Sequence, residues 1–597
     1  MRAAAFVMVC MVLLLGCEQQ PNTAFTEEEA LADTGPLHQG KPITAIIREF
    51  GIQPPNPSAR EPLLHQLADG LRKADPKQRY EGVTFRLSEN NALDPGWLVQ
   101  TPNWWGRRAA DLPYYEPGCP GCLSEVGLPE CSADSDCTRG GSCRALKILE
   151  ADPRQANKKV CVGHSDDTVD GLYRLVSSAR YRVDIATLQP APDGRYLAAL
   201  RRALLRIAQS GRAVTVRVLI GQYPPLETDP LALLIDLTEG LHVAPQSKLS
   251  LYVATMRSCL HARTCGNFSW NHAKIIVVDG GHAVVGGHNM WTRDYLLDRP
   301  IADLSMYLRG PAAGDATAFA DEMWDWVCTH DGDKHQAIEV RSVTPGDRTF
   351  GRRCPPKRLS LGHDRLRKPG NVPVMAVARL GAGISDDFAN HSDLARDLMF
   401  ASARTSIRIV QQDFGFNFAQ PQTIYPESSM ERLMDFALKD QGDLFIVLSN
   451  YKATGRSGAT YSNRLQIEAT ARKFREVARR RSSLSDDALN ALLCRRVHIA
   501  PYRFSEDATW PNNVPIGNHS KFWMVDDRAF YIGSDNIYPV DLQEFGYIVD
   551  SRQAVADIHR EYWGPLWRWS SPHRISGAGA SRCIFTEPAP APRGRSR

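Results

Sequence analysis

Two stretches of the chain carry the same reactive side chains at the same spacing. The first reads SWNHAKIIVVDGGHAVVGGHN, and the second, in the other half of the chain, reads IGNHSKFWMVDDRAFYIGSDN. Both fit N-H-x-K-x4-D-x6-G-[GS]-x-N without an insertion, which exceeds what chance produces. We interpret them as a duplicated active-site element, whose matched residues are Asn271, His272, Lys274, Asp279, Gly286, Gly287 and Asn289 in the first copy and Asn518, His519, Lys521, Asp526, Gly533, Ser534 and Asn536 in the second.

Two histidines with two lysines can cleave a phosphodiester. One neutral imidazole can attack the phosphorus while the other protonates the leaving alkoxide. Lysine and asparagine side chains can stabilise the charge on the phosphoryl oxygens. This chemistry needs no metal or cofactor, and the sequence has no H-E-x-x-H, Walker or G-x-S-x-G motif that would indicate other hydrolytic machinery. A single copy would equally suit a buried hairpin with a core histidine, but two copies favour a catalytic pair.

We expect each copy to form a strand hairpin. Side chains alternate between the two faces of a strand, so the His and the Lys, two residues apart, point the same way. The Asp of the motif lies five residues beyond the Lys and faces the other side. It opens a turn, at Asp279 or Asp526, where a carboxylate can accept backbone N–H groups. From the spacing alone we therefore predict a structural role for this Asp.

The paired motif resembles the HKD motif of the phospholipase D superfamily, and its flanks resemble the secreted phospholipase D of streptomycetes. The resembling segments run through most of the chain: GWLVQTPNWWG (96–106), YRVDIATLQPAPDG (181–194), SWNHAKIIVVDG (269–280), RGPAAGDATAFADEMWDWVC (309–328), GNVPVMAVARLGAGI (370–384) and DRAFYIGSDNIYPVDLQEFGYIVDS (527–551). The resemblance implies that the His, Lys and Asp of both motifs form the catalytic set.

The resemblance also implies roles for single residues. His272 would be the nucleophile and His519 the acid and base, an assignment that the sequence by itself leaves open. Asp303 and Glu544 would orient the histidines; alternatively they are ordinary surface acids, with Asp298 and Asp541 nearby. The lysines and the asparagines Asn289 and Asn536 would bind phosphate oxygens. The small pairs Gly286-Gly287 and Gly533-Ser534 match those of the secreted enzymes.

The headgroup site is predicted from aromatic residues. Trp291, Tyr295 and Tyr461 lie at positions that resemble the aromatic wall near the alcohol site, and aromatic faces can hold a quaternary ammonium. Packing in the core is the alternative for each of them. Trp104, Trp105 and Trp510 are candidates for contact with a lipid interface, with packing again as the alternative for the first two.

The periodicity of apolar residues predicts an α/β fold of the αβ-sandwich class. In both halves a strand, a helix, a second strand and a further segment precede the motif hairpin in the same order. These lie at 181–189, 195–210, 213–221 and 249–256 in the first half, and at 405–414, 426–439, 444–450 and 496–504 in the second. We predict two homologous phospholipase D-like domains related by a pseudo-twofold axis, with the motifs face to face. The predicted divisions are a leader (1–16), a disordered tether (17–61), an N-terminal domain (62–345) with a Cys-rich insert (116–163), a linker (346–395) and a C-terminal domain (396–590).

The leader and the cysteines indicate export. Residues 1–16 read as a signal peptide that ends in a lipobox, so Cys17 would be lipidated and the protein anchored to a membrane, with the outer membrane as one destination; ordinary cleavage and secretion is the alternative. Of 14 cysteines, six form a dense insert that we interpret as a disulfide-stapled knob. Half a zinc site at Cys119-Pro-Gly-Cys122 is the alternative there. Cys259 and Cys265 bracket a short loop and are predicted to pair, and the resemblance implies the disulfides Cys328–Cys354 and Cys494–Cys583.

Composition fits an exported enzyme that acts at a bilayer. Hydrophobic content of 43%, charged content of 23% and a net charge of +4 describe a folded, mildly basic protein without the basic stripe of a nucleic-acid binder. The resemblance implies a monomeric phospholipase D whose partner is a phosphatidylcholine bilayer, with no nucleic acid bound, and composition favours a bilayer surface only weakly. The alternatives are a nuclease of the same superfamily and a surface binding protein that keeps a relic of the catalytic fold.

Overall fold

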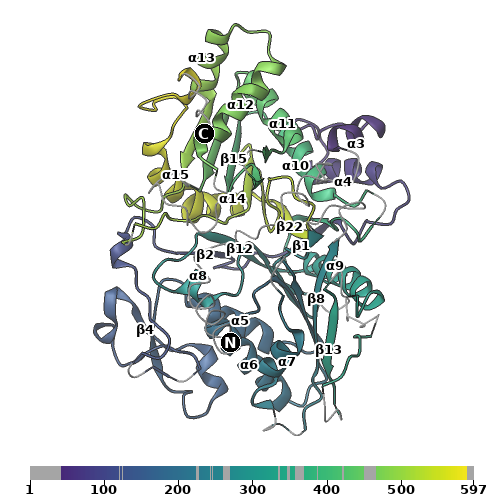
Figure 1. Ribbon diagram of the computed structural model, residues 1–597, viewed down its shortest axis with the longest axis vertical. Coiled ribbons are helices and arrows are strands. Elements are labelled where there is room, and N and C mark those ends of the chain that lie inside the picture. Colours follow the sequence, from purple (N-terminus) through teal and green to yellow (C-terminus); the bar gives the residue numbers. More distant parts are fainter. Residues whose placement is uncertain are drawn as a thin grey trace, which may run out of the picture.

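The computed structural model describes residues 42–587, apart from gaps at 120–121, 124, 224–226, 242–243, 245, 260–268, 334–336, 346–349, 357–368, 386–387, 420–421, 450–464 and 512. The described chain is a mixed α/β fold with two large sheets, as predicted. Figure 1 shows the two halves stacked one above the other, with the strands of both meeting in the middle. The predicted leader, Cys17, Cys265 and Tyr461 lie outside the described residues.

Both sheets use the same strand order. In the first half, β8 (Ser250–Cys259), β7 (Thr215–Gly221), β6 (Arg182–Leu188), β10 (Ile275–Val278), β11 (His282–Gly286) and β12 (Asp303–Arg309) are neighbours in that order, with β2 (Leu98–Thr101) beyond β12 and β13 (Glu339–Val343) beyond β8. In the second half, β19 (Val497–Pro501), β18 (Asp443–Leu448), β15 (Ser406–Gln411), β20 (Phe522–Val525), β21 (Ala529–Gly533) and β22 (Glu544–Asp550) follow the same order, with β14 (Val372–Arg379) and β1 (Phe85–Asn91) beyond β22. The first three strands of each set are parallel and the hairpin strands are antiparallel. The pseudo-twofold axis itself stays a prediction.

Apolar periodicity explains why the helices lie against the sheets. In α6 (Gly194–Gln209), Leu200, Leu204 and Ile207 are buried, and their spacings of four and three residues place them on one face. The first half is covered by α5 (Asp167–Ser177), α6 and α7 (Pro230–Thr238), and the second by α10 (His391–Ser402), α11 (Glu427–Leu438), α12 (Ile467–Arg481) and α13 (Asp486–Arg496). The helix α9 (Pro311–Thr329) contacts strands of both sheets. Strands β11 and β12 also contact β21 and β22, so one core extends across the two halves.

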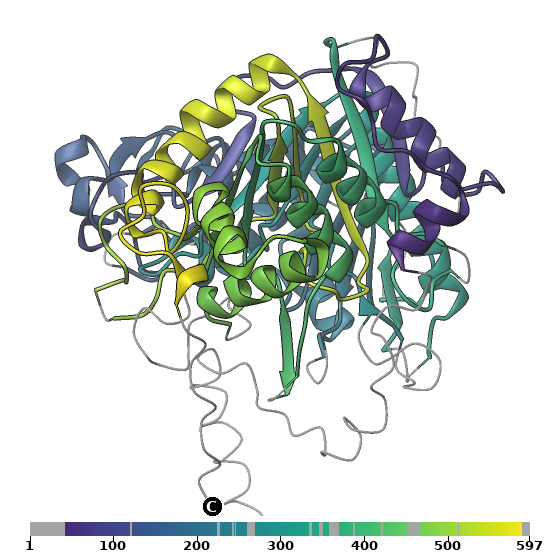
Figure 2. The same ribbon diagram turned by 90° about the horizontal axis from the view of Figure 1, so that it is seen from above.

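The N-terminal segment corrects two of the predicted divisions. Residues 42–61 were expected to be tether, but Ile43–Glu49 forms helix α3, and Ile46 and Ile52 are buried. Figures 1 and 2 show α3 and the following α4 (Leu63–Ala74), both purple, beside α10 of the second half, which they contact. Strand β1 then pairs with β14. The chain therefore enters the second sheet before it builds the first, because burying these apolar side chains requires α10 and β14.

The predicted linker is also partly regular structure. Strand β14 (Val372–Arg379) lies within 346–395 and pairs with both β1 and β22. Its six residues from Val374 to Arg379 are buried, so it is an interior strand of the second sheet. A division into 62–345 and 396–590 thus cuts the second sheet from two of its strands.

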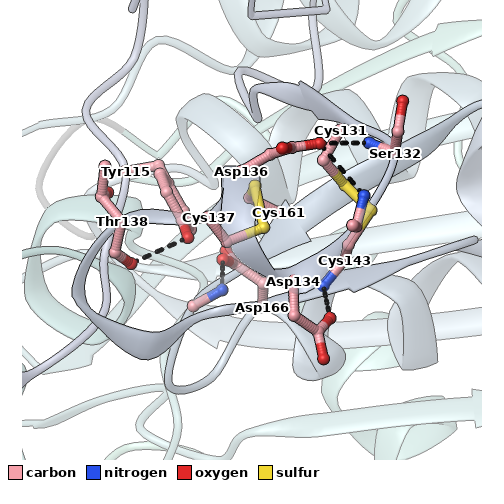
Figure 3. The surroundings of a disulfide bond; sticks show 12 residues. Tyr115, Cys131, Ser132, Asp134, Asp136, Cys137, Thr138, Cys143, Cys161 and Asp166 are labelled. Carbon is pink, nitrogen blue, oxygen red and sulfur yellow. Dashed lines mark hydrogen bonds between the residues drawn. A yellow bond between two sulfur atoms is a disulfide. The ribbon is translucent and has the colours of Figure 1, made fainter.

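The Cys-rich insert is a small disulfide-bonded unit, as predicted. Its sheet has the order β3 (Glu130–Cys131), β5 (Lys159–Val162), β4 (Ser142–Arg144), and the disulfides are Cys119–Cys122, Cys131–Cys143 and Cys137–Cys161. Figure 3 shows the last two, with Asp134 and Asp136 accepting backbone N–H groups of Cys143 and Ser132. The bond between Cys119 and Cys122 rules against half a zinc site there.

Buried arginines of α6 hold the insert to the first half. Arg195 donates to the carbonyl of Gly127 at 2.9 Å and pairs with Asp166 at 3.0 Å. Arg202 donates to the carbonyl of Ile148 at 3.1 Å. The disulfides Cys328–Cys354 and Cys494–Cys583 form outside the insert. Within the described ranges, no helix combines the length and the apolar character that crossing a membrane requires.

Candidate active site

Each motif histidine lies just ahead of its hairpin. The hairpins form as predicted, β10 with β11 and β20 with β21. His272 and Lys274 precede the first residue of β10, and His519 and Lys521 precede that of β20, so these side chains stand in irregular backbone. Each segment forms backbone bonds to the other half of the molecule at the position of its histidine.

Two short backbone bridges join each histidine to the opposite half. The His272 N–H donates to the carbonyl of Gln543 at 2.9 Å, and Asn271 and Gln543 form a parallel bridge. In the same way the His519 N–H donates to the carbonyl of Ala302 at 2.7 Å, beside a bridge between Ala302 and Asn518. Gln543 and Ala302 stand directly before Glu544 and Asp303. The bridges therefore place an acid of each half beside the histidine of the other half.

The two imidazole rings meet in one buried site. Their centroids are 6.2 Å apart and the ring planes are inclined at 80°. His272 is 5% exposed and His519 is 4% exposed. This arrangement brings together the two motifs that the sequence separates, at a distance that one phosphoryl group can bridge.

The carboxylates behind the rings are exchanged between the halves. Nδ1 of His272 is 2.9 Å from Oε1 of Glu544, and Nδ1 of His519 is 2.8 Å from Oδ2 of Asp303. Both acids are buried, which rules out the alternative of surface acids. A hydrogen bond from Nδ1–H to a carboxylate fixes the tautomer, so that Nε2 of each ring carries the reactive lone pair.

The lysines and asparagines line the same site. Nζ of Lys274 donates to the carbonyl of His272 at 2.6 Å, and Nζ of Lys521 donates to that of His519. Neither side-chain polar atom of Asn289 has a hydrogen-bond partner among the described residues, although the residue is 1% exposed. Asn536 donates to the Tyr538 hydroxyl at 2.7 Å and its Oδ1 is also unpartnered within the described chain. A buried amide without partners is costly, so these groups are suited to bind oxygens of a ligand.

The small residues of the motifs leave room for the acids. A Cβ at Gly287 would lie 1.9 Å from Oδ1 of Asp303, so no side chain fits there. The matched residue of the second copy, Ser534, donates its hydroxyl to Oε2 of Glu544 at 2.5 Å. In the first copy the corresponding donor is the Tyr295 hydroxyl, 2.9 Å from Oδ2 of Asp303.

The Asp of each motif holds a strand end, as its spacing predicts. Asp279 accepts the N–H groups of Arg180, Tyr181 and Arg182 at 2.8 to 2.9 Å, where β6 begins. Asp526 accepts those of Arg404, Thr405 and Ser406 at 2.7 to 3.1 Å, where β15 begins. This bonding engages both carboxylates at the strand starts, and their structural role stays a prediction.

Burial and the lysine charges set the ionisation of the site. Burial, together with Lys274 and Lys521, holds the pKa of His272 well below its usual range, and burial with Lys521 does the same for His519. Burial lowers the pKa of Lys521 to about 7 and raises that of Glu544 to about 7. Burial opposes ionisation of Asp303 as well, but its interactions with His519, His288 and Lys521 outweigh burial and hold the pKa of Asp303 below the usual range. Both histidines are therefore neutral in the empty site, as a nucleophile and a base must be.

The described residues of the predicted aromatic wall are buried. Tyr295 is fully buried and its hydroxyl donates to Asp303 at 2.9 Å, so it lies beside that acid. Trp291 is 8% exposed and donates to the carbonyl of Pro190 at 2.9 Å. Trp510 is 1% exposed and belongs to the core, which excludes contact with a lipid surface.

Arg379 is a residue of the site that the sequence argument misses. It is 1% exposed, and its Nη2 lies 3.7 Å from Oε1 of Glu544. The sequence signal that could have identified Arg379 is its place as the single charged residue at the end of the apolar run VPVMAVAR. An arginine buried with such a strand requires an acid beside it.

Comparison with known proteins gives one extended similarity. The chain is 28% identical to a phospholipase D of Streptomyces antibioticus over 615 residues, covering 94% of this chain and 98% of that protein. No family model matches the chain. Similar solved structures include a phosphatidylserine synthase of Haemophilus influenzae (TM-score 0.44, 14% identity, covering 75% of this chain and 90% of the other) and a phospholipase D family member of Salmonella typhimurium (TM-score 0.19, 15% identity, 30% and 88%). The resemblance to the phospholipase D superfamily that the paired motifs indicate is confirmed.

Proposed function

Because the chain resembles phospholipase D over most of its length, we propose that it is an exported phospholipase D. It hydrolyses phosphatidylcholine, and other glycerophospholipids, to phosphatidic acid and the free headgroup alcohol. The observation that carries this proposal is the buried histidine pair, 6.2 Å apart, with a carboxylate from the opposite half behind each ring. A bilayer phospholipid is its partner.

The first step forms a phosphohistidine. Nε2 of His272 attacks the phosphorus, the bond from phosphorus to the headgroup oxygen breaks, and protonated His519 gives its proton to the departing alkoxide. The ionised Asp303 supports this role, because a carboxylate at 2.8 Å stabilises the imidazolium form of His519. His519 takes up the required proton as the anionic ester binds and is neutral again after the alcohol forms.

The second step returns the enzyme to its starting state. Neutral His519 takes a proton from water, the oxygen attacks the phosphorus, and the bond between phosphorus and Nε2 of His272 breaks. Phosphatidic acid leaves, His272 is neutral again, and His519 releases the proton that it took from water, so both rings are neutral as in the empty site. An alcohol in place of water gives a new phosphodiester, so transfer to alcohols is the expected side activity.

The lysines and asparagines hold the phosphoryl oxygens through both steps. Lys274 and Lys521 are buried and supply positive charge where the oxygens stand, and charge-assisted hydrogen bonds are strong in such a setting. Asn289 adds an N–H donor whose binding to the ester would satisfy its buried amide. Asp279 and Asp526 take no part in these steps.

The membrane location is a further part of the proposal. The leader and Cys17 indicate a lipoprotein, which would keep the enzyme at a bilayer surface. Metabolic labelling with palmitate should tag the wild-type protein and leave Cys17→Ala untagged. Labelling of neither protein would favour plain secretion.

Release of choline from phosphatidylcholine vesicles tests the proposed activity. The wild type should release choline and phosphatidic acid, and His272→Ala and His519→Ala should abolish release while both variants stay folded. A plasmid and an oligonucleotide serve as controls for nuclease activity. A folded wild type that releases no headgroup from any common phospholipid would overturn the proposal, and cleavage of the nucleic acids would replace it with a nuclease.

A further inference from the structure

Arg379 stands directly across the sheet from the acid of His272. In the antiparallel pair of β14 and β22, Arg379 is the register partner of Glu544. Its Nη2 lies 3.7 Å from Oε1 of Glu544, which in turn accepts from Nδ1 of His272. The carboxylate of Glu544 therefore lies between the guanidinium of Arg379 and the ring of His272.

The guanidinium is fixed by bonds on every side. Nε donates to the carbonyl of Leu542 at 3.0 Å, Nη1 to Asp393 at 3.1 Å and Nη2 to Oδ1 of Asp535 at 3.1 Å. Asp535, which lies inside the second motif, is held from its other side by Ser392 at 2.7 Å and Arg396 at 3.2 Å. All of these side chains are buried, so the positive charge at Arg379 cannot move away from Glu544.

The first copy of the motif has a neutral pair at the matching positions. The register partner of Asp303 is Thr101, and His288 stands where the second copy has Asp535. Oγ1 of Thr101 is 2.9 Å from Nε2 of His288, whose Nδ1 is 2.8 Å from the Ser305 hydroxyl. Burial lowers the pKa of His288, so it is neutral. Arg379 and Asp535 lie beside Glu544 in the second copy. The matching residues beside Asp303 in the first copy are Thr101 and the neutral His288.

This difference makes the two histidines chemically unequal. A cation beside Glu544 favours its ionised form and disfavours a second positive charge on His272. His519 has the opposite setting, because Asp303 receives only the neutral Tyr295 hydroxyl and Leu304 N–H besides the histidine in the described chain. His272 is therefore biased toward the neutral form that attacks, and His519 toward the protonated form that donates.

We propose that Arg379 is a positioning residue that gives His272 the nucleophile's role, by holding Glu544 ionised and His272 neutral. This inference rests on the proposed function, in which His272 is the nucleophile that attacks the phosphorus. Because Glu544 and His272 share a hydrogen bond, they titrate as a pair, and Arg379 lowers the apparent pKa at which the pair gains a proton.

The charges that face the pair are of both signs. Burial lowers the pKa of His272, Lys274, Lys521 and Arg379 lower it further, and Asp303 acts in the opposite direction. Burial raises the pKa of Glu544 to about 7 against the pull of Arg379. The other titratable groups that act on Glu544 are Lys274, Lys521, Asp535, Tyr531 and Tyr538. The two lysines act on both histidines, so Arg379 is the cation that separates the two copies.

The pH dependence of kcat/KM tests this role. Bis(p-nitrophenyl) phosphate is a suitable substrate because it is soluble and binds without a bilayer. In Arg379→Met the acidic limb should move to higher pH by about 1 to 3 units, the range for loss of one nearby opposite charge. Arg379→Lys keeps the charge and should restore most of the wild-type profile.

Arg396→Met is the matched control. Arg396 is a buried arginine of the same network, bonded to Asp535 and Asp393. Within the described chain it forms no ion pair with Glu544. Its loss should lower the melting temperature and leave the acidic limb at the wild-type pH. An unmoved limb in Arg379→Met, or an equal shift in Arg396→Met, would overturn the proposal.

Two further measurements keep the test decisive. If Arg379→Met does not fold, the double variant Arg379→Met with Asp535→Asn removes both charges of the pair. It should shift the limb in the same direction by a smaller amount, because the loss of the Asp535 charge favours ionised Glu544. Histidine-selective ¹⁵N NMR of the free enzyme, with His272→Gln for assignment, should show a higher apparent pKa of His272 in either variant. This titration needs no turnover, so an inactive wild type would refute the proposed function, whereas an unchanged His272 titration would refute the role of Arg379.

Discussion

At the residue scale, the exchanged acids predict different defects for two similar variants. Asp303→Asn removes the charge that supports protonated His519, so release of choline, a leaving group that needs a proton, should fall by about 10²- to 10⁴-fold. A p-nitrophenolate leaves without a proton. Asp303→Asn should therefore keep a burst of p-nitrophenolate from a nitrophenyl phosphodiester, and rapid mixing measures its amplitude.

The contrasting variant is Glu544→Gln, which acts on the attacking His272. It should lose the burst along with turnover, because the imidazole is no longer held in the reactive tautomer. If each acid instead served the histidine of its own half, the two burst phenotypes would be exchanged, and that outcome would contradict the pairing in the structure.

A second prediction at this scale concerns the charge of Lys521. Burial lowers its pKa to about 7, so at pH 8 the amine of the empty enzyme is mostly neutral. An oxyanion beside Nζ raises this pKa above 8, and the amine gains a proton as the anion binds. We expect tungstate, a dianion at this pH, to bind with net proton uptake of which Lys521 contributes about one proton, and calorimetry in buffers of different ionisation enthalpy measures the total.

Lys521→Arg is the control for this proton. A guanidinium is charged at every accessible pH, so the variant should bind tungstate with about one proton less taken up. The pKa of Lys274 is lowered as well, and its contribution should remain in both proteins. The same uptake in wild type and Lys521→Arg would show that another group takes the proton.

At the element scale, the motif aspartates matter for strand attachment. Asp279→Ala leaves three backbone N–H groups at the start of β6 without their acceptor, and should lower the free energy of unfolding by about 1 to 3 kcal/mol. The histidines keep their bridges and acids, so kcat/KM below the melting range should stay within about threefold of wild type. Denaturant unfolding and steady-state kinetics measure the two effects.

His272→Ala is the opposite control for that variant, because it should lose activity and keep its stability. Asp526→Ala should repeat the behaviour of Asp279→Ala, since its carboxylate makes the matching bonds to the start of β15. A folded Asp279→Ala protein as inactive as His272→Ala would show that the carboxylate acts in the chemistry.

Local sequence predicts these elements well where one period covers a segment. The strands at 181–189 and 213–221, the helix at 195–210 and the motif hairpins form close to the predicted bounds. The tether prediction fails at 42–61 because it overlooks a short helical pattern: Ile43, Ile46, Ile47 and Phe50 recur at i, i+3, i+4 and i+7 and pack on the core, where α3 contacts α10. For β14 no local signal names the partners, because β1 and β22 come from distant parts of the chain.

At the scale of the whole molecule, the sequence predicts which residues form the site but not which acid bonds to which histidine. The motif residues and the two acids follow from spacing and resemblance. The His, Lys and Asn of both motifs and the two acids are buried, with the histidine rings 6.2 Å apart, whereas Asp279 and Asp526 lie at the starts of β6 and β15. The exchange of the acids does not follow, because it depends on the bridges from Asn271 to Gln543 and from Ala302 to Asn518. No local pattern encodes a contact between residues so far apart. The role of Tyr295 was missed for the same reason, since an aromatic residue in a sequence does not show which way its hydroxyl points.

The exchange predicts that neither half can act alone. A protease site inserted within 357–368, outside the described residues, divides the chain after Cys354. Neither Cys328–Cys354 nor Cys494–Cys583 crosses this cut, so no disulfide of the described chain would join the fragments. The first fragment lacks Glu544, which holds His272, and the second lacks Asp303, which holds His519. Each fragment, isolated after denaturation and refolded, should be inactive.

The cleaved but undenatured protein should remain one active particle. Strand β1 of the first fragment pairs with β14 of the second, and α9 contacts both sheets, so separation would expose a shared apolar core. We expect one peak on gel filtration and a kcat/KM within about threefold of the intact chain, since the cut leaves both histidine–carboxylate pairs in place. Fragments that separate without denaturant, or a first fragment active by itself, would contradict the arrangement, because the catalytic centre belongs to the contact between the halves and not to either of them.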